Sequence, residues 1–138
     1  MNYARSPLVA VQSAVYDRVM GDHPDYLLSR YEPETNPGYP RAAFGAIDGV
    51  PHNTKSTLGY MLTWPIDIYS QSPGLTELEG LLNGYLESLT DRTRPLSVCD
   101  DWELVALEAP WTVTTEQRDD GVIQHATIRL SIEVEDAS

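Results

Sequence analysis

An unusually long stretch of alternating side chains, from Thr57 to Tyr69, constrains the fold of this chain more than any other feature. Because successive side chains of a strand point to opposite faces, the pattern predicts a strand with one apolar face in a core and one mixed face. Typical strands have about five or six residues, so this one is long. Pro65 cannot donate a ladder hydrogen bond, so the strand either bends there or reaches beyond its own domain. The apolar positions are Leu58, Tyr60, Leu62, Trp64, Ile66 and Ile68.

The composition predicts a single folded domain over residues 1–138, because 41 % of the residues are hydrophobic and the length suits one core. A net charge of −12 argues against a surface that grips nucleic acid or an anionic membrane, since such surfaces need clustered lysine and arginine. No apolar run approaches the roughly 20 residues that span a bilayer, and no signal-peptide pattern opens the chain. We therefore expect a soluble protein made in the cytoplasm.

The remaining segments predict two helices and several further strands. Ser6 caps a helix over residues 6–21, and Ser72 caps a leucine-striped helix over residues 73–89. The apolar phase changes inside the 102–113 strand, which predicts a bulge or two strand pieces joined near Leu107. The other expected segments are strands over 41–47 and 121–134, a proline-rich connector with one helical turn over 22–40, a polar loop over 48–56 and a polar tail over 135–138. This order predicts an α+β fold, with a largely antiparallel sheet of four to five strands and two helices packed on one face.

No catalytic or metal-binding constellation stands out in the sequence. Cys99 is the only cysteine, and the carboxylates beside it suppress the reactive thiolate. His23, His52 and His125 share no metal-ligand spacing. The acids before Gly121 are explained by a tight hairpin turn. We therefore expect no enzyme, no metal and no cofactor.

The polar loop and the mixed face of the long strand are the candidate contact surface. The 48–56 loop is longer than the usual hairpin connection, which favours a role in binding. It contains Thr54 and Lys55, the only lysine in the chain. The contact residues that we expect are Arg41, His52, Thr54, Lys55 and Met61.

Several short motifs in this order resemble the tail-terminator (tail-completion) proteins of long-tailed bacteriophages. The resemblance covers nearly the whole chain. Its motifs are a valine-rich first helix, the segment Y-P-R-A-A-F-G-A-I-D, Thr54-Lys55 in the loop, Ile68-Tyr69-Ser70 at the end of the long strand, the leucine-striped helix from Pro73 to Leu89, the Asp120-Gly121 turn and the last strand from Thr127 to Glu135. The proline-rich connector and the strong acidity are departures from that pattern.

The resemblance implies a virion protein that assembles into a ring, usually a hexamer, at the junction of head and tail. Such a ring caps the tail tube, stops its polymerisation and offers a surface to the connector or neck of the head. Its partners would be copies of itself, the tail tube protein and the neck protein, and genome DNA would pass through without specific binding. The acidic composition fits this role, since like charge keeps DNA from adhering to the wall. We therefore expect the acids to cluster on the inner surface.

Two other interpretations remain open at this point. One is another neck component, such as a head-completion or adaptor protein with a similar small α+β fold. The other is a small acidic enzyme or ligand-binding domain. That domain would need a convergent polar pocket, and the sequence indicates none.

Overall fold

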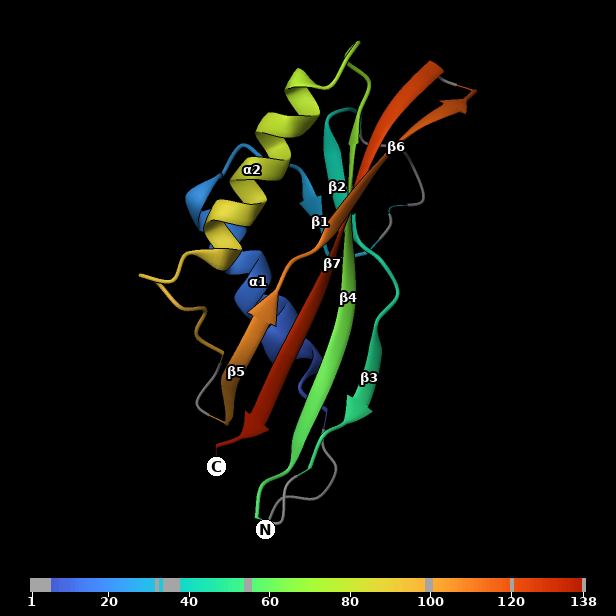
Figure 1. The fold of residues 1–138 in the computed structure, drawn as a ribbon. Helices are drawn as coiled ribbons and strands as arrows, with labels where there is room; N and C mark the ends of the chain where they lie inside the picture. Colours follow the sequence, from blue (N-terminus) through green and yellow to red (C-terminus); the bar gives the residue numbers. More distant parts are fainter. Residues whose placement is uncertain are drawn as a thin grey trace.

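Two helices lie against one face of a long sheet in the computed structural model (Figure 1). The structure describes residues 6–31, 33, 38–53, 56–98, 101–119 and 121–137. In chain order the elements are α1 (Leu8–Asp22), β1 (Leu28–Ser29), β2 (Arg41–Phe44), β3 (Asp48–Pro51), β4 (Gly59–Ser70), α2 (Thr76–Thr90), β5 (Trp102–Glu108), β6 (Trp111–Arg118) and β7 (Gly121–Asp136). No helix in these ranges is long and apolar enough to cross a membrane.

The two long strands β4 and β7 form the central ladder of the sheet. They are antiparallel and paired from Gly59↔Glu135 to Ser70↔Gln124. Strands β2 and β3 pair with successive parts of the outer edge of β4. Strands β6 and β5 pair in the same way with the outer edge of β7. Strand β1 adds to β2 in parallel.

On each side of the ladder, the two flanking strands are separated by a gap. Both gaps lie at the same level, where Pro65 pairs with Arg129. On one side the Gly45 amide donates to the Pro65 carbonyl at 2.9 Å, and on the other the Arg129 amide donates to the Pro110 carbonyl at 2.8 Å. We call the part with β1, β2 and β6 the β6 half of the sheet, and the part with β3 and β5 the β3 half.

The position of Pro65 explains why a proline is tolerated in so long a strand. The nitrogen and carbonyl of one residue point to the same side of an antiparallel strand, so the Pro65 nitrogen faces the gap between β2 and β3. The strand continues through this point and is paired on both sides at each end. The first residues of the strand stay within the sheet of their own domain, because Tyr60 and Met61 lie between β3 and β7.

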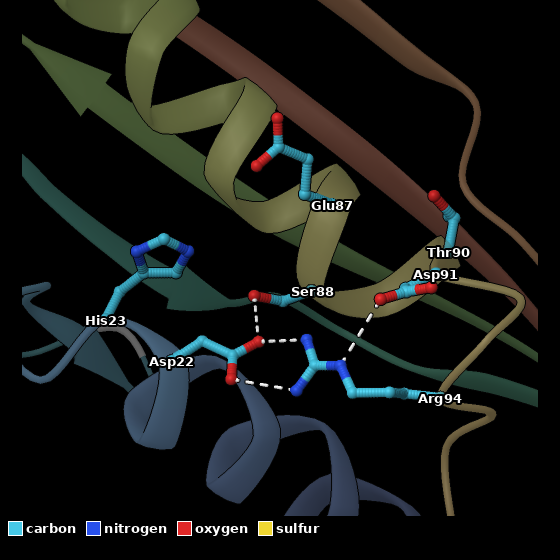
Figure 2. A pocket seen from close by; sticks show the side chains of 7 residues that line it. All are labelled: Asp22, His23, Glu87, Ser88, Thr90, Asp91 and Arg94. Carbon is cyan, nitrogen blue, oxygen red and sulfur yellow. Dashed lines mark hydrogen bonds and ion pairs between the residues drawn. The ribbon is translucent and has the colours of Figure 1, made fainter.

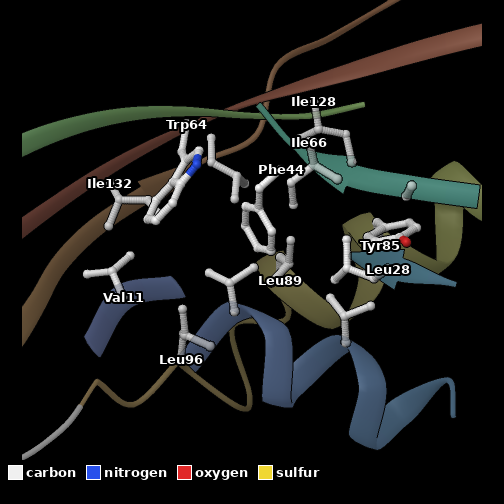
Figure 3. Packing of buried hydrophobic residues seen from close by; sticks show 14 of the residues in the cluster. Val11, Leu28, Phe44, Trp64, Ile66, Tyr85, Leu89, Leu96, Ile128 and Ile132 are labelled. Atoms are coloured by element: carbon white, nitrogen blue, oxygen red, sulfur yellow. The ribbon is translucent and has the colours of Figure 1, made fainter. Parts of the chain in front are cut away.

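The apolar faces of the helices and of the central ladder meet in one core (Figure 3). The alternation that predicts the long strand is confirmed, since Leu62, Ile66 and Ile68 are almost fully buried. The other fully buried members include Val11, Val15 and Val19 of α1, Leu78 of α2, and Ile128, Leu130 and Ile132 of β7. The Trp64 indole, at the level of the two gaps, donates to the Gly45 carbonyl at 3.1 Å.

The expected α+β fold with both helices on one face is confirmed, but the sheet has seven strands within the described residues, not four to five. Strand β3 lies inside the expected 48–56 loop, and β1 stands where one helical turn was expected. Both segments are held by backbone ladders to their neighbours rather than by an apolar pattern of their own. The phase change is explained by a bulge between Leu104 and Ala106 and by a junction at residues 109–110.

The helix starts also differ in detail from the expectation. The first helix begins at Leu8 with Pro7 rather than Ser6 in the cap position, although the Ser6 hydroxyl accepts a hydrogen bond from the Leu8 amide at 3.2 Å. The cap expected at Ser72 is wrong, because α2 begins at Thr76 and follows Leu75. Glu77 in its first turn instead accepts a hydrogen bond from the Ser70 hydroxyl at 2.6 Å, which ties the helix to the end of β4.

Candidate functional site

The sheet face that the helices leave uncovered, here called the free face, gathers the polar side chains of the central ladder. Cross-strand partners point to the same face, so the register assigns each side chain to the core or to the free face. In the β3 half, this face carries five acids, interspersed with small and apolar side chains such as Val50 and Met61. They are Asp48, Glu103, Glu108, Glu133 and Glu135.

Among the described residues, few cations stand near these acids in the β3 half. The His52 ring lies 3.0 Å from the Glu133 carboxylate, and its side chain is 57 % exposed. Glu103 and Glu135 are directly opposite each other, and like charges in such a pair repel. The β3 half therefore presents a negative surface to its surroundings.

The β6 half of the free face is organised around His125. The His125 Nε2 atom lies 2.8 Å from the Asp67 carboxylate, and its Nδ1 atom lies 2.8 Å from the Glu116 carboxylate. The Thr127 hydroxyl also donates to Asp67 at 2.8 Å. Because both ring nitrogens face carboxylates, this geometry favours the protonated ring, in which both nitrogens donate. Strands β4, β7 and β6 are joined through this one side chain.

Titration of the pair follows from that geometry. The hydrogen bond to Asp67 raises the pKa of His125, against the opposing effect of burial. Burial alone would raise the pKa of Asp67, but hydrogen bonds from His125 and Thr127 lower it. Each partner therefore stabilises the charged form of the other.

Tyr69 forms the second part of this cluster. Its ring stacks on His125 with centroids 4.5 Å apart. The guanidinium carbons of Arg41 and Arg118 lie 4.4 Å and 4.8 Å from the ring centroid. Arg118 also pairs with Glu116 at 3.2 Å, so aromatic and ionic contacts form one connected cluster.

The structure separates the residues that the sequence nominated as contacts. Arg41 is 7 % exposed and belongs to the Tyr69 cluster in the β6 half. His52 and Met61 lie in the β3 half, where Met61 stands between Val50 and Glu133. Thr54 and Lys55 lie outside the described residues. The His125 cluster was missed, because its members are far apart in the sequence.

A second polar cluster joins the C-terminal ends of the two helices (Figure 2). Arg94 binds both oxygens of Asp22, at 3.1 Å and 2.8 Å, and the Ser88 hydroxyl donates to Asp22 at 2.8 Å. The hydrogen bonds from Arg94 and Ser88 hold the pKa of Asp22 well below its usual range. Arg18 donates to the Ser88 carbonyl at 3.1 Å. These groups satisfy one another, so the cluster acts as a clamp between the helices.

The described ranges of the chain contain no group of three His, Cys, Asp or Glu side chains that could hold a metal ion. Cys99 and Asp100 fall outside those ranges. The polar clusters that are described consist of ion pairs and hydrogen bonds between side chains. These interactions hold strands and helices together and place charged groups at the surface.

No protein-family model matches this sequence, and no curated protein is similar to it in sequence. Several solved structures are similar in fold, and two of them are virion or bacteriophage proteins. A chain from the virion of a native gene transfer agent particle has a TM-score of 0.71 and 16 % identity, covering 97 % of this chain and 99 % of that one. The bacteriophage SPP1 gp17 protein has a TM-score of 0.57 and 22 % identity, covering 90 % and 88 %. The chain therefore has the fold of a virion component and of a bacteriophage protein, in line with its resemblance to the tail-terminator family.

Proposed function

We propose that this chain is a structural virion protein whose copies form a ring on the end of a phage tail tube. The ring stops tube polymerisation and joins the tail to the head. The observation that carries the proposal is the acidic free face of the β3 half, on a fold also found in a virion particle. A ring lined by this face offers DNA a wall of like charge, to which DNA does not adhere.

A closed ring needs two different complementary patches on each subunit, because its contacts are head-to-tail. The sheet supplies two different sets of outer strands, β2 and β3 beside β4, and β6 and β5 beside β7. The ring would be a hexamer, as the resemblance implies. Its two ends would contact the tube protein and the neck protein.

We retain His52, Thr54, Lys55 and Met61 as contact residues of this assembly, and give Arg41 an indirect role. His52 and Met61 lie together in the β3 half, which makes that end the better candidate for the tube contact. Arg41 is covered by its own cluster, so its contribution would be to shape the β6 half rather than to touch a partner directly.

The decisive experiment mixes the purified protein with tail tubes that lack a cap and with filled heads that lack tails. We expect rings on tube ends and arrested tube growth by electron microscopy, and a Lys55→Glu variant that binds at least tenfold more weakly while unfolding at the same temperature. Binding to filled heads alone would instead assign the protein to the neck. A monomer that binds neither assembly would refute both assignments.

A further inference from the structure

Strand β6 has the least protected edge in the described sheet. Its first five residues, Trp111 to Thr115, contain no charge and no proline and favour extended structure. The other outer strands carry the usual protections: β3 is short and ends in Pro51, β5 has two acids and a bulge, and β1 has two residues. An open edge of this kind is a template for another strand.

The register shows which backbone groups of β6 are available. The Pro110 carbonyl accepts from the Arg129 amide, and hydrogen-bonded and non-hydrogen-bonded residues alternate along an antiparallel strand. The residues that direct their amide and carbonyl groups away from β7 are therefore Trp111, Val113, Thr115 and Gln117. The side chains of Trp111 and Val113, on the helix side of the sheet, are 51 % and 37 % exposed.

The outer edge of β3 can be derived in the same way. The His52 amide donates to the Gly59 carbonyl at 2.8 Å, so Gly49 and Pro51 direct their backbone groups away from β4. This edge offers one amide, from Gly49, and two carbonyls. Gly49 and Pro51 also face the helix side, where they leave room for a large side chain such as Trp111.

We propose that β6 of one copy adds to the outer edge of β3 of the next copy, so that the sheet continues from subunit to subunit. The proposal rests on the ring proposed above and identifies the interface between neighbouring subunits, here called the seam. Within one copy, β3, β4, β7 and β6 are each antiparallel to the next. Placing the next β3 beside β6 preserves that alternation, as copies related by rotation require.

The offset between the two edges also fits a closed ring. Strand β3 lies level with Ser131–Val134 of β7, whereas β6 lies level with Gly121–Ile128. Closing a sheet into a barrel requires tilted strands and a stagger in register, which this offset supplies with each copy. The seam joins the uncharged segment from Trp111 to Thr115 to β3, whose one charged residue is Asp48, and this limits repulsion between copies of a chain with net charge −12.

Two pairs of variants test the seam. Val113→Pro removes an outward amide without touching the ladder to β7, whereas Val113→Thr keeps that amide. Gly49→Pro removes the outward amide of β3, whereas Gly49→Ala keeps it and adds only a methyl group 3.2 Å from the end of the Leu62 side chain. We expect both proline variants to lose at least tenfold in ring assembly, measured by light scattering alone and by sedimentation with tail tubes, and both controls to assemble.

A photo-crosslinker locates the partner strand directly. With benzoylphenylalanine in place of Trp111 and mixed isotope-labelled copies, we expect an intermolecular crosslink to the peptide that contains residues 48–51. Rings that form normally from both proline variants, or a crosslink to another segment, would overturn the seam while leaving tube capping intact. A wild-type chain that forms no ring, alone or on tubes, would overturn the seam together with the ring. Circular dichroism of each variant verifies that the monomer is folded.

Discussion

The free face holds one histidine–carboxylate pair in each half of the sheet, and the two pairs are built differently. In the β6 half, His125 is 18 % exposed, lies between Asp67 and Glu116, and stacks on Tyr69. In the β3 half, His52 is 57 % exposed and meets a single acid, Glu133. The first pair joins three strands and is shielded from water, whereas the second stands among acids at the surface. One half is therefore built for cohesion and the other for presenting charge.

Removing each histidine is the strongest test of this difference. His125→Ala should lower the free energy of unfolding by about 2 kcal/mol, because it leaves the half-buried Asp67 carboxylate without its hydrogen-bonded cation. The matched variant His52→Ala should cost less than about 0.5 kcal/mol, as exposed ion pairs do. Urea unfolding of both variants measures the two values. Equal losses would contradict the contrast between the halves.

The stability that His125 contributes should depend on pH. Folding raises the pKa of His125 above its ordinary value of 6.5, so this contribution is complete below that pH and is lost as pH rises through the raised pKa. Folding lowers the pKa of Asp67, so its contribution is present above about pH 3.9 and is lost as pH falls through the lowered value. The stability difference between wild type and His125→Ala should therefore peak between these limits. A difference that does not change from pH 5 to pH 9 would refute the imidazolium bridge.

The boundary between the halves can be tested at Gly45. A β-carbon there would lie 2.9 Å from Cγ of Pro65 and 3.3 Å from the Asp67 carboxylate. Gly45→Ala should therefore cost about 1 to 2 kcal/mol, as overpacking does. Gly80→Ala, where nothing lies within 4 Å, is the control and should stabilise α2 by about 0.5 to 1 kcal/mol. Thermal unfolding compares the two, and a tolerated alanine at position 45 would show that the boundary is loosely packed.

The sequence predicts those parts of the fold whose signal is local and apolar. The even positions of β4 are identified by period two alone, and Leu62 and Ile66 are buried as that period requires. The helices follow from their valine and leucine stripes. Strand β3 could not be predicted this way, because all four of its residues are exposed and its Gly49 and Pro51 are typical of a loop. Its pairing with β4 is a backbone contact that its own side chains do not encode.

The polar clusters escape sequence analysis for a related reason. His125 and Asp67 are 58 residues apart, and only the register of β4 against β7 brings them together. No spacing rule of the kind that identifies a metal site applies to such a pair. The acids of the β3 half were foreseen as a property of the composition, but their position on one face required the pairing of β5 and β3 with the central ladder.

The smallest expected effect is a gain in stability in the β3 half. Glu103 lies directly opposite Glu135, and replacing one member of a like-charged pair removes a repulsion. Glu103→Gln should raise the free energy of unfolding by about 0.5 kcal/mol at low salt, and less at high salt, where charges are screened. Glu108→Gln is the matched control, since Glu108 faces Ser131 and has no like-charged partner there. A gain at Glu103 but not at Glu108 would mean that this half keeps its surface negative at a cost in stability, as the proposed ring around DNA would require.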